Sequence, residues 1–301
     1  MNSENIFTLS PVCKSLIWGG TKLSEQYNKI CTDNTYGKGI IGESWELVAY
    51  RGDVCTVSDG MYAGSDITAA AECDIPVILK YIDAAEPLSV QVHPNKTEMW
   101  YIVDADPDAE IVNGLKDSFS EKDFRKALSD GRVFDLLKSV KVKAGDVFFI
   151  PSGLVHSLGK GILVAEIQQA STDTYRVYDF NRLHNGKPRE LHIDAAMKVI
   201  RDYTDDELHQ ARFSSLSAID SESDSSLIAD CEYFSVYRFS GSKNASRSFK
   251  TEGKNAAVMC CAGNGKVNNK PTKKGETLFV KRDCPEFTLE GEMNALVCFF
   301  L

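Results

Sequence analysis

The sequence has 301 residues, a formal net charge of −9 and a hydrophobic content of 43%, values that are ordinary for a globular protein with a sizeable core. The acidic balance and the absence of a long Lys/Arg run argue against a nucleic-acid binder, although a few Lys and Arg in a cleft can still bind an anionic substrate. No apolar run reaches membrane-spanning length, no signal-peptide pattern opens the chain, and the nine cysteines include no CxxC pair. We therefore expect a cytoplasmic protein with free thiols that binds neither membranes nor nucleic acid.

Short strand-like segments fill the first part of the chain. They are rich in Val, Ile, Phe and Tyr and are bounded by Gly, Pro, Asn or Asp, which is typical of β-strands. These segments span residues 44–50, 77–84, 88–93, 98–105, 146–151 and 162–169. Three stretches have helical patterns instead: 120–131, which begins with a Ser cap and ends with Gly, then 189–202 and 204–212.

The last part of the chain repeats this strand-rich character after a polar interruption. Residues 214–230 are rich in Ser and Asp, so we expect a linker there and a division into domains 1–213 and 214–301. Further strand-like segments follow at 233–240, 255–262, 276–281 and 294–301. Many short strands with few helices predict an all-β sandwich or barrel.

A faint internal repeat relates the two predicted domains. Residues 143–158 (KAGDVFFIPSGLVHSL) align with 273–289 (KKGETLFVKRDCPEFTL) when Gly145 is matched to Gly275. In this alignment His156 becomes Glu286. The repeat predicts two related units, of which the second has lost the histidine.

A first group of candidate metal ligands lies in the segment LSVQVHPNKTE. On a strand, Gln91 and His93 point to the same face because side chains alternate. Pro94 ends the strand, and a short turn can return Glu98 toward the same point. Imidazole and carboxylate groups are good zinc ligands, and a Gln oxygen can add a weaker one.

A second ligand is indicated by the spacing around His156. In GDVFFIPSGLVH a Gly-Asp turn leads into an apolar strand, and a Pro-x-Gly turn then places His156 at the start of the next strand, facing inward. This spacing is that of the second cupin motif, with Lys160 in place of its usual Asn. It favours two cupin-type β-barrels (jelly rolls) with a few inserted helices. The ligand set His93, Glu98 and His156 favours zinc, but iron, manganese or cobalt fit the same donors.

Each of these residues also has an ordinary structural explanation. A single His at a strand end is commonly a satisfied polar group, Glu98 alone would be a surface carboxylate, and Gln91 alone would be a hydrogen-bonding residue. Only their combination with the turn spacing favours a metal site. Among the other histidines, His184 and His209 are interpreted as surface or structural residues, and His192 as the one that can approach a site.

Most of the chain resembles the short bacterial form of type I mannose-6-phosphate isomerase. The matching segments are 15–23 (SLIWGGTKL), 42–47 (GESWEL), 77–95, 96–115, 150–182 and 187–196. The resemblance implies one zinc per chain held by His93, Glu98 and His156, with Gln91 as a further ligand. It also implies an active-site role for Arg176. One departure is the turn before Glu98, which is shorter than in many relatives.

The reaction implied by the resemblance converts mannose 6-phosphate to fructose 6-phosphate through a cis-enediol. Arg176 is expected to stabilise the enediolate or the phosphate, because guanidinium pairs with oxyanions, unless Asp173 or Asp179 occupies it. Lys80, an inward Lys on a strand, is expected to meet the substrate, and Glu166 is expected to take part in catalysis or to order a ligand. Lys96, Trp18 and Glu46 are further predicted to bind the substrate by lining its cavity, with a solvated position as the alternative for Lys96 and a core position as the alternative for Trp18.

Two other classes of function stay open on the residues alone. One is a metal-binding cupin of other specificity, such as a dioxygenase or another sugar-phosphate isomerase. The other is a non-catalytic sugar-binding cupin. In either case the partner is a small molecule, and the chain is expected to be a monomer or a homodimer.

Overall fold

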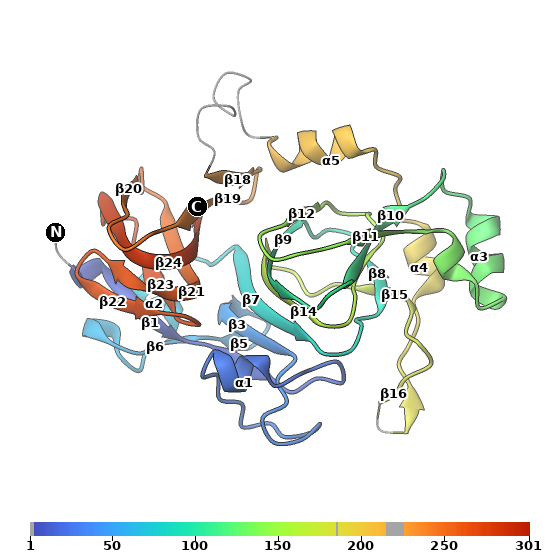
Figure 1. Cartoon of the computed structure of the whole chain (residues 1–301), viewed down its shortest axis with the longest axis horizontal. Coiled ribbons are helices and arrows are strands. Elements are labelled where there is room, and N and C mark those ends of the chain that lie inside the picture. Colours follow the sequence, from blue (N-terminus) through green and yellow to red (C-terminus); the bar gives the residue numbers. More distant parts are fainter. Residues whose placement is uncertain (1–2, 185, 215–225) are drawn as a thin grey trace.

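The computed structural model describes residues 3–184, 186–214 and 226–301, and it is dominated by strands, with 44% strand and 14% helix (Figure 1). Two strand-rich units lie side by side, one built mainly from the middle of the chain and one from its C-terminal part. We call them the central unit and the C-terminal unit. The predicted predominance of β-structure is confirmed.

Two antiparallel sheets form the central unit. The six-stranded sheet has the order β12 (Val147–Ile150), β9 (Glu98–Ala105), β14 (Ile162–Gln169), β7 (Val77–Ala84), β3 (Glu43–Leu47) and β2 (Val12–Lys14). The five-stranded sheet has the order β11 (Leu137–Lys141), β10 (Glu110–Leu115), β13 (His156–Leu158), β8 (Val90–Val92) and β15 (Tyr175–Tyr178). Buried residues of both sheets, such as Trp100 and Leu158, share one apolar cluster, so the sheets pack face to face.

One nine-stranded sheet forms the C-terminal unit. Its order is β18 (Leu227–Asp230), β19 (Ser235–Ser240), β24 (Glu286–Phe300), β21 (Asn255–Val267), β23 (Thr277–Val280), β1 (Ile6–Ser10) and β6 (Thr56–Val57), with β20 (Ser246–Lys250) on β24 and β22 (Lys270–Lys273) on β21. In the two long strands Gly263 and Gly291 take positive φ, and the pairing of these strands shifts register between Cys260 and Ala262. Because Phe249 of β20 and Val297 of β24 belong to one buried cluster, the two halves of the sheet pack against each other.

The two units share one strand topology. The central order β7-β14-β9-β12 corresponds to β19-β24-β21-β23, and the order β8-β13-β10-β11 corresponds to β20-β24-β21-β22. Each long strand of the C-terminal unit therefore corresponds to two strands of the central unit. Gly145 and Gly275, matched in the sequence repeat, both have positive φ (94° and 87°) just before the corresponding strands β12 and β23. The predicted relationship between two units is thus visible in the fold.

A shared apolar interface joins the units. Tyr81 and Met99 of the six-stranded sheet lie in the same buried cluster as Phe279 and Phe300 of the C-terminal sheet. Because this face of the six-stranded sheet is covered by the C-terminal unit, its opposite face is the one that looks into the central unit. The side chains of the candidate site lie on that inner face.

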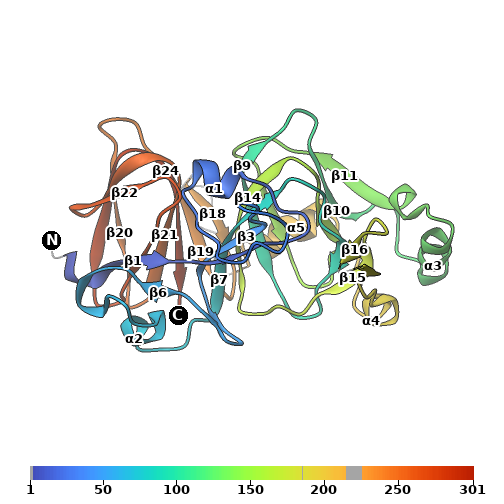
Figure 2. The same ribbon diagram turned by 90° about the horizontal axis from the view of Figure 1, so that it is seen from below.

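The helices are few and lie outside the sheets (Figure 2). They are α1 (Lys22–Gln26), α2 (Ile67–Ala71), α3 (Glu121–Ser129), α4 (Ile193–Met197) and α5 (Asp205–Arg212). The helices predicted at 120–131 and 204–212 are present, with Ser120 capping α3 and a capping box of Thr204 and Glu207 on α5. The helix predicted at 189–202 is shorter, because residues before it run along β15, where the His192 N–H donates to the carbonyl of Arg176.

Two short hairpins complete the elements. They pair β4 (Ala49–Tyr50) with β5 (Asp53–Val54), and β16 (Leu183–His184) with β17 (Lys187–Pro188). Single 3-10 turns lie at Ser3–Asn5, Gly60–Tyr62 and Val133–Asp135.

Three predictions about the fold, namely the two barrels, the linker and the domain boundary, are not confirmed by the described residues. Within the described ranges no sheet closes into a barrel, so the two predicted cupin barrels are not confirmed and the units are open, face-packed sheets. Most of the predicted linker, residues 215–225, lies outside the described residues, while 227–230 form strand β18. The division at 213/214 stays a prediction, and β1, from the start of the chain, pairs with β23 of the C-terminal unit, as the blue strand beside the red ones shows in Figure 1.

In the part of the chain that the structure describes, no helix has both the length and the apolar character needed to cross a membrane.

Candidate functional site

Three side chains with metal-binding chemistry meet inside the central unit. His93 follows β8, Glu98 opens β9 and His156 opens β13, and their candidate donor atoms all lie within 4.8 Å of one another. The two Nε2 atoms are 3.1 Å apart, and the Glu98 oxygens lie 3.5 Å from His93 Nε2 and 3.3 Å from His156 Nε2. All three side chains are buried. The structure therefore brings the predicted ligands to one point.

Local backbone geometry explains this convergence. The Pro-x-Gly turn before His156 lies directly against the end of β8, because the N–H of Gly153 donates to the carbonyl of His93 at 2.9 Å. Gly153 has a φ of +91°, and a Cβ there would lie 2.7 Å from the Val199 carbonyl oxygen, so only glycine fits. The short turn before Glu98 is fixed by a 2.7 Å hydrogen bond from the Thr97 N–H to Gln169 Oε1.

Hydrogen bonds and burial leave the two imidazoles ready to bind a cation. Nδ1 of His93 lies 2.9 Å from the carbonyl of Asp173, and Nδ1 of His156 lies 2.8 Å from that of Leu154, so each Nδ1 carries the proton and each Nε2 exposes a lone pair. Burial lowers the pKa of His156 to about 4, and burial together with the Lys96 charge lowers the pKa of His93 well below its usual value. Both rings are therefore neutral at pH 7.

The carboxylate of Glu98 completes a donor set that fits a metal. Burial, together with the charge of Glu166, raises the pKa of Glu98 to about 7. Neither of its oxygens has a hydrogen-bond partner among the described residues, although Lys96 Nζ forms an ion pair with Oε2 at 2.8 Å. Two facing imidazole lone pairs and a buried carboxylate repel one another unless a cation lies between them, and neutral imidazole with carboxylate is a donor set that zinc prefers.

Gln91 lies at the edge of this cluster. Its strand position pairs it with His156 on one side and with Arg176 on the other. Its amide nitrogen, Nε2, lies 3.3 Å from Nε2 of His156. A 180° rotation of the amide exchanges its oxygen and nitrogen, so the amide oxygen can occupy this position beside His156 Nε2. Gln91 is thus within reach of the cluster, as expected from strand alternation.

A cavity of about 290 Å³ adjoins the cluster. Its lining consists of Trp18, Glu43, Lys80, Ile82, Leu88, Ser89, Gln91, Lys96, Trp100, Leu158, Glu166, Thr172, Thr174, Arg176 and Arg189. Four of these side chains are cationic and two are carboxylates, so the cavity favours a small anion in a protein that is acidic overall. Of the residues predicted to line a site, Lys80, Lys96, Trp18, Arg176 and Glu166 do so.

Lys80 and Glu166 face each other on paired strands. They are register partners on β7 and β14, and Lys80 Nζ lies 3.1 Å from Glu166 Oε1, with Glu43 Oε2 at 3.7 Å. Burial alone would lower the pKa of Lys80, but the charges of Glu166 and Glu43 outweigh it, and the pKa is raised. Burial alone would raise the pKa of Glu166, but Lys80 outweighs it, and the pKa is lowered. Both groups are therefore charged. The other carboxylate oxygen of Glu166, Oε2, accepts a hydrogen bond from Trp100 Nε1 at 2.8 Å.

Arg176 reaches the cavity from β15 without a carboxylate partner among the described residues. Asp173 pairs with Arg51, and Asp179 pairs with Arg182 and Arg189. Neither carboxylate therefore forms the ion pair with Arg176 that a purely structural role would require. The Nε of Arg176 is buried and has no hydrogen-bond partner within the described ranges, while Nη1 donates to the carbonyl of Glu190 at 2.9 Å. His192 contacts the backbone of this strand, because its Nδ1 accepts the Arg176 N–H at 3.2 Å, but it is not among the residues that line the cavity.

Two charged cavity residues were not predicted from the sequence. Glu43 lies on the same face of β3 as Trp45, which is the register partner of Lys80. Arg189 lies beyond the β16–β17 hairpin, and its guanidinium stacks over Trp18 at 5.2 Å. Strand alternation could have indicated Glu43 once the pairing with β7 was known, but only the tertiary fold brings Arg189 to the cavity.

Glu46 does not line the cavity, contrary to expectation. Its side chain points to the opposite face of β3, where Lys29 Nζ lies 2.7 Å from Oε1 and Thr277 donates to Oε2 at 2.8 Å. Thr277 belongs to β23 of the C-terminal unit, so Glu46 helps to join the units. The cavity-lining role predicted for it is wrong, because sequence alternation alone did not say which face of this strand looks inward.

Comparison with known proteins supports the family resemblance. No model of a known protein family matches this chain. The mannose-6-phosphate isomerase ManA of Bacillus subtilis (strain 168) is 33% identical over 326 residues, which cover 99% of each chain. The crystal structure of the mannose 6-phosphate isomerase from Bacillus subtilis superposes with a TM-score of 0.82 at 30% identity, covering 98% of this chain and 99% of that one.

A more distant structure shares the fold. It is the crystal structure of a mannose 6-phosphate isomerase bound with zinc and yttrium, with a TM-score of 0.69 at 14% identity and coverage of 98% of this chain and 99% of that one. Since a relative at 33% identity matches nearly the whole length, this chain belongs to the mannose-6-phosphate isomerase family.

Proposed function

We propose that this protein interconverts mannose 6-phosphate and fructose 6-phosphate through a cis-enediol, with one zinc ion per chain. The observation that carries the proposal is the meeting of His93, Glu98 and His156 next to a small cationic cavity. Full-length similarity to curated mannose-6-phosphate isomerases supports the choice of reaction. The same donor set in a dioxygenase would need no cluster of cations beside it.

The metal would be held by His93, Glu98 and His156, with Gln91 as a fourth donor. When bound, zinc supplies Lewis-acid stabilisation for the negative charge that develops on the sugar oxygens at C1 and C2. One zinc per chain is expected, because among the described residues this is the one group of three such side chains close enough to share an ion.

The chain's own cations bind and orient the substrate in this proposal. Arg176 presents an unpartnered buried Nε to the cavity and pairs with an oxyanion of the enediolate or of the phosphate. Lys80 donates from Nζ to a sugar oxygen, and Glu166 acts as a positioning residue that keeps this ammonium charged and aimed. Trp18 and Arg189 border the cavity and exclude water from one side of the bound sugar.

The two units correspond to the predicted pair of cupin-type β-barrels in this proposal. Their common strand topology supports a duplicated origin, although their sheets stay open in the described residues. In the division into domains 1–213 and 214–301, strand β1 lies in the first domain by sequence but pairs with β23 of the second unit. A cytoplasmic setting and a monomer or homodimer complete the proposal.

The direct test is an isomerase assay on purified protein with mannose 6-phosphate, coupled to detection of fructose 6-phosphate. We expect turnover of mannose 6-phosphate, none with unphosphorylated mannose, and loss of turnover in His156→Ala. An exposed-surface variant, Lys198→Ala, is the matched control for purification and handling. Binding of mannose 6-phosphate without any turnover would instead identify a sugar-binding protein and contradict the proposal.

A further inference from the structure

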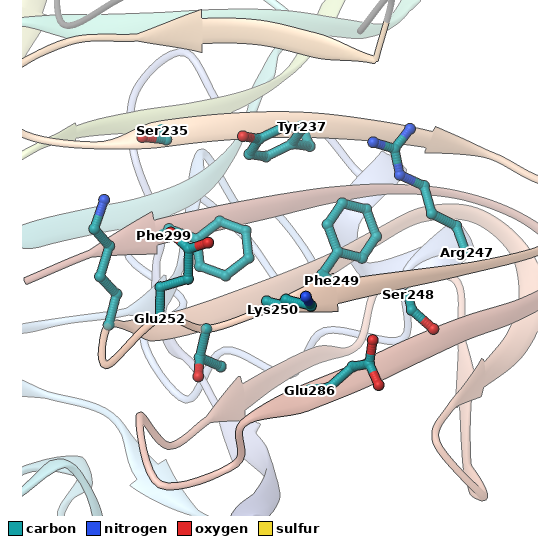
Figure 3. Close-up of a pocket in the computed structure, with 11 residues that line it drawn as sticks. Ser235, Tyr237, Arg247, Ser248, Phe249, Lys250, Glu252, Glu286 and Phe299 are labelled. Atoms are coloured by element: carbon teal, nitrogen blue, oxygen red, sulfur yellow. The ribbon is translucent and has the colours of Figure 1, made fainter.

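A second cavity, of about 350 Å³, opens in the C-terminal unit (Figure 3). Its lining consists of Ser235, Tyr237, Arg247, Ser248, Phe249, Lys250, Thr251, Glu252, Lys254, Glu286 and Phe299. These residues come from β19, β20, β24 and the turn that follows β20. None of them belongs to the candidate active site.

Strand register shows that this cavity is the counterpart of the active-site cavity. In the central unit Gln91 pairs with His156, and in the C-terminal unit the inward-facing partners at the same place are Phe249 and Phe287. Seven positions separate Gln91 from Glu98 and also Phe249 from Ala256, and the register partners of Glu98 and Ala256, Ile150 and Val280, occupy corresponding strands. Lys96 therefore corresponds to Lys254. Both of these lysines line their cavities.

This register corrects the sequence alignment by one residue. Glu286, matched there to His156, pairs with Lys250, and the inward position belongs to Phe287. Phe287 lies seven residues after Val280, whereas His156 lies six residues after Ile150, and this difference shifts the match. The predicted loss of the histidine in the second unit holds in both alignments.

The metal ligands have no equivalents in the second cavity. The positions of His93 and Glu98 are taken by Thr251 and Ala256, while Phe249 and Phe287 replace Gln91 and His156. Neither hydroxyl, methyl nor phenyl groups offer the donor set that zinc prefers. The cavity has therefore kept its place in the fold without the means to hold a metal.

Its lining instead combines aromatic faces with separated charges. The rings of Tyr237, Phe249 and Phe299 lie between Arg247 and Glu252 in Figure 3. The Arg247 guanidinium lies 4.9 Å from the Phe249 ring centre, which holds its fork at the cavity. A flat or apolar ligand face fits against such rings, while an acid group pairs with cations of the lining.

The charges of this lining favour an anion. Arg247, Lys250 and Lys254 outnumber Glu252 and Glu286. Across the described ranges, no ion pair engages the ammonium of Lys250 or Lys254. Lys250 and Lys254 are therefore suited to a phosphate, and Glu252 and Ser235 to sugar hydroxyls.

We infer that the C-terminal unit carries a second, non-catalytic binding site for a small phosphorylated sugar, in the cavity that corresponds to the active site. The existence of the site rests on the cavity and its register, and the choice of a sugar phosphate as ligand rests in addition on the proposed function. Because the ligand would bind without metal, it binds unchanged.

The test is calorimetric titration of the full chain with mannose 6-phosphate in the presence of a chelator, which prevents turnover. We expect two molecules per chain in the unmodified protein and in Arg238→Ala. This matched control removes an arginine from the opposite face of β19 to Tyr237. Lys250→Ala and Lys254→Ala should each weaken the second event by about tenfold or more, while thermal melting stays unchanged.

Three further arms keep the outcomes distinct. Arg176→Ala should remove only the active-site event, so its failure to do so would count against the proposed function and not against the second site. Inorganic phosphate and mannose alone should each bind the second site more weakly than mannose 6-phosphate. A second event that Lys250→Ala and Lys254→Ala leave intact, or the absence of any binding event in Arg176→Ala, would overturn the inference.

Discussion

The carboxylate of Asp179 accepts a 2.7 Å hydrogen bond from Nε of Arg189, and this contact fixes the arginine that stacks over Trp18 at the cavity. Asp179 also accepts from Arg182, which is held in turn by the carbonyl of Pro87. One buried carboxylate therefore orients two cations near the candidate active site. The arrangement connects the stability of the β15 region to the affinity of the cavity for an anion.

Asp179→Asn should loosen Arg189 and raise KM for mannose 6-phosphate more than it lowers kcat. It should also destabilise the fold by about 1–3 kcal/mol at pH 7, because hydrogen bonds to charged partners are lost. Urea unfolding and steady-state kinetics measure both effects. Arg51→Ala, which removes an exposed ion pair with Asp173, is the control and should change neither quantity much.

The destabilisation by Asp179→Asn should depend on pH. Burial raises the pKa of Asp179, but hydrogen bonds from Arg189 and Arg182 outweigh burial and lower it. A carboxyl with a lowered folded pKa contributes stability that is present above its unfolded pKa, at about 4, and that disappears as the pH falls through the folded value. The difference between the unfolding free energies of the two proteins should therefore shrink at pH 3. A difference that grows toward acid pH would contradict the assignment.

Lys80→Met should destabilise the protein by about 3–5 kcal/mol, because it leaves the Glu166 carboxylate charged and buried without its cation. Lys80→Met combined with Glu166→Leu should cost less than the sum of the two single changes. A double-mutant cycle from urea unfolding measures this coupling. Additive effects would show that the two side chains do not stabilise each other.

Arg176→Lys should lower kcat by about a hundredfold or more while leaving the melting temperature unchanged, since a lysine keeps the charge and loses the forked geometry. The matching change Arg51→Lys, on an exposed arginine of the same region, should leave kcat unchanged. Equal effects of the two substitutions would remove Arg176 from the active site.

Gly153→Ala should weaken both fold and metal binding. The added Cβ would lie 2.7 Å from the Val199 carbonyl oxygen, in a turn with positive φ. The turn must therefore move, which costs about 1–3 kcal/mol and displaces His156. Gly145→Ala is the matched control, because its φ is +94° but a Cβ there meets nothing within 4 Å. Only the Gly153 variant should need more zinc for half-maximal activity.

Sequence patterns predicted the strands best where both faces are buried. The segments 77–84, 98–105 and 162–169 match β7, β9 and β14 at both ends, because all are apolar runs closed by turn residues. The helix at 189–202 was predicted too long, since its first residues bond to β15, a partner that no local pattern reveals.

The site was predictable where spacing constrains the backbone. The turn at Gly153 and the alternation of Gln91 with His93 indicated which side chains converge as candidate metal ligands, since turn geometry and strand alternation are local. Glu46 was misplaced because alternation does not tell which face of a strand looks inward. Arg189 was missed because its approach depends on Asp179 and on a hairpin, which are tertiary facts.

The central claim is that isomerisation requires a metal held by His93, Glu98 and His156. Zinc should be titrated into chelator-treated protein while turnover of mannose 6-phosphate is followed, with His156→Ala in parallel. We expect activity near zero without metal, a linear rise that reaches its plateau at about one zinc per chain, and no recovery in the variant. Full activity in the metal-free protein would contradict the account.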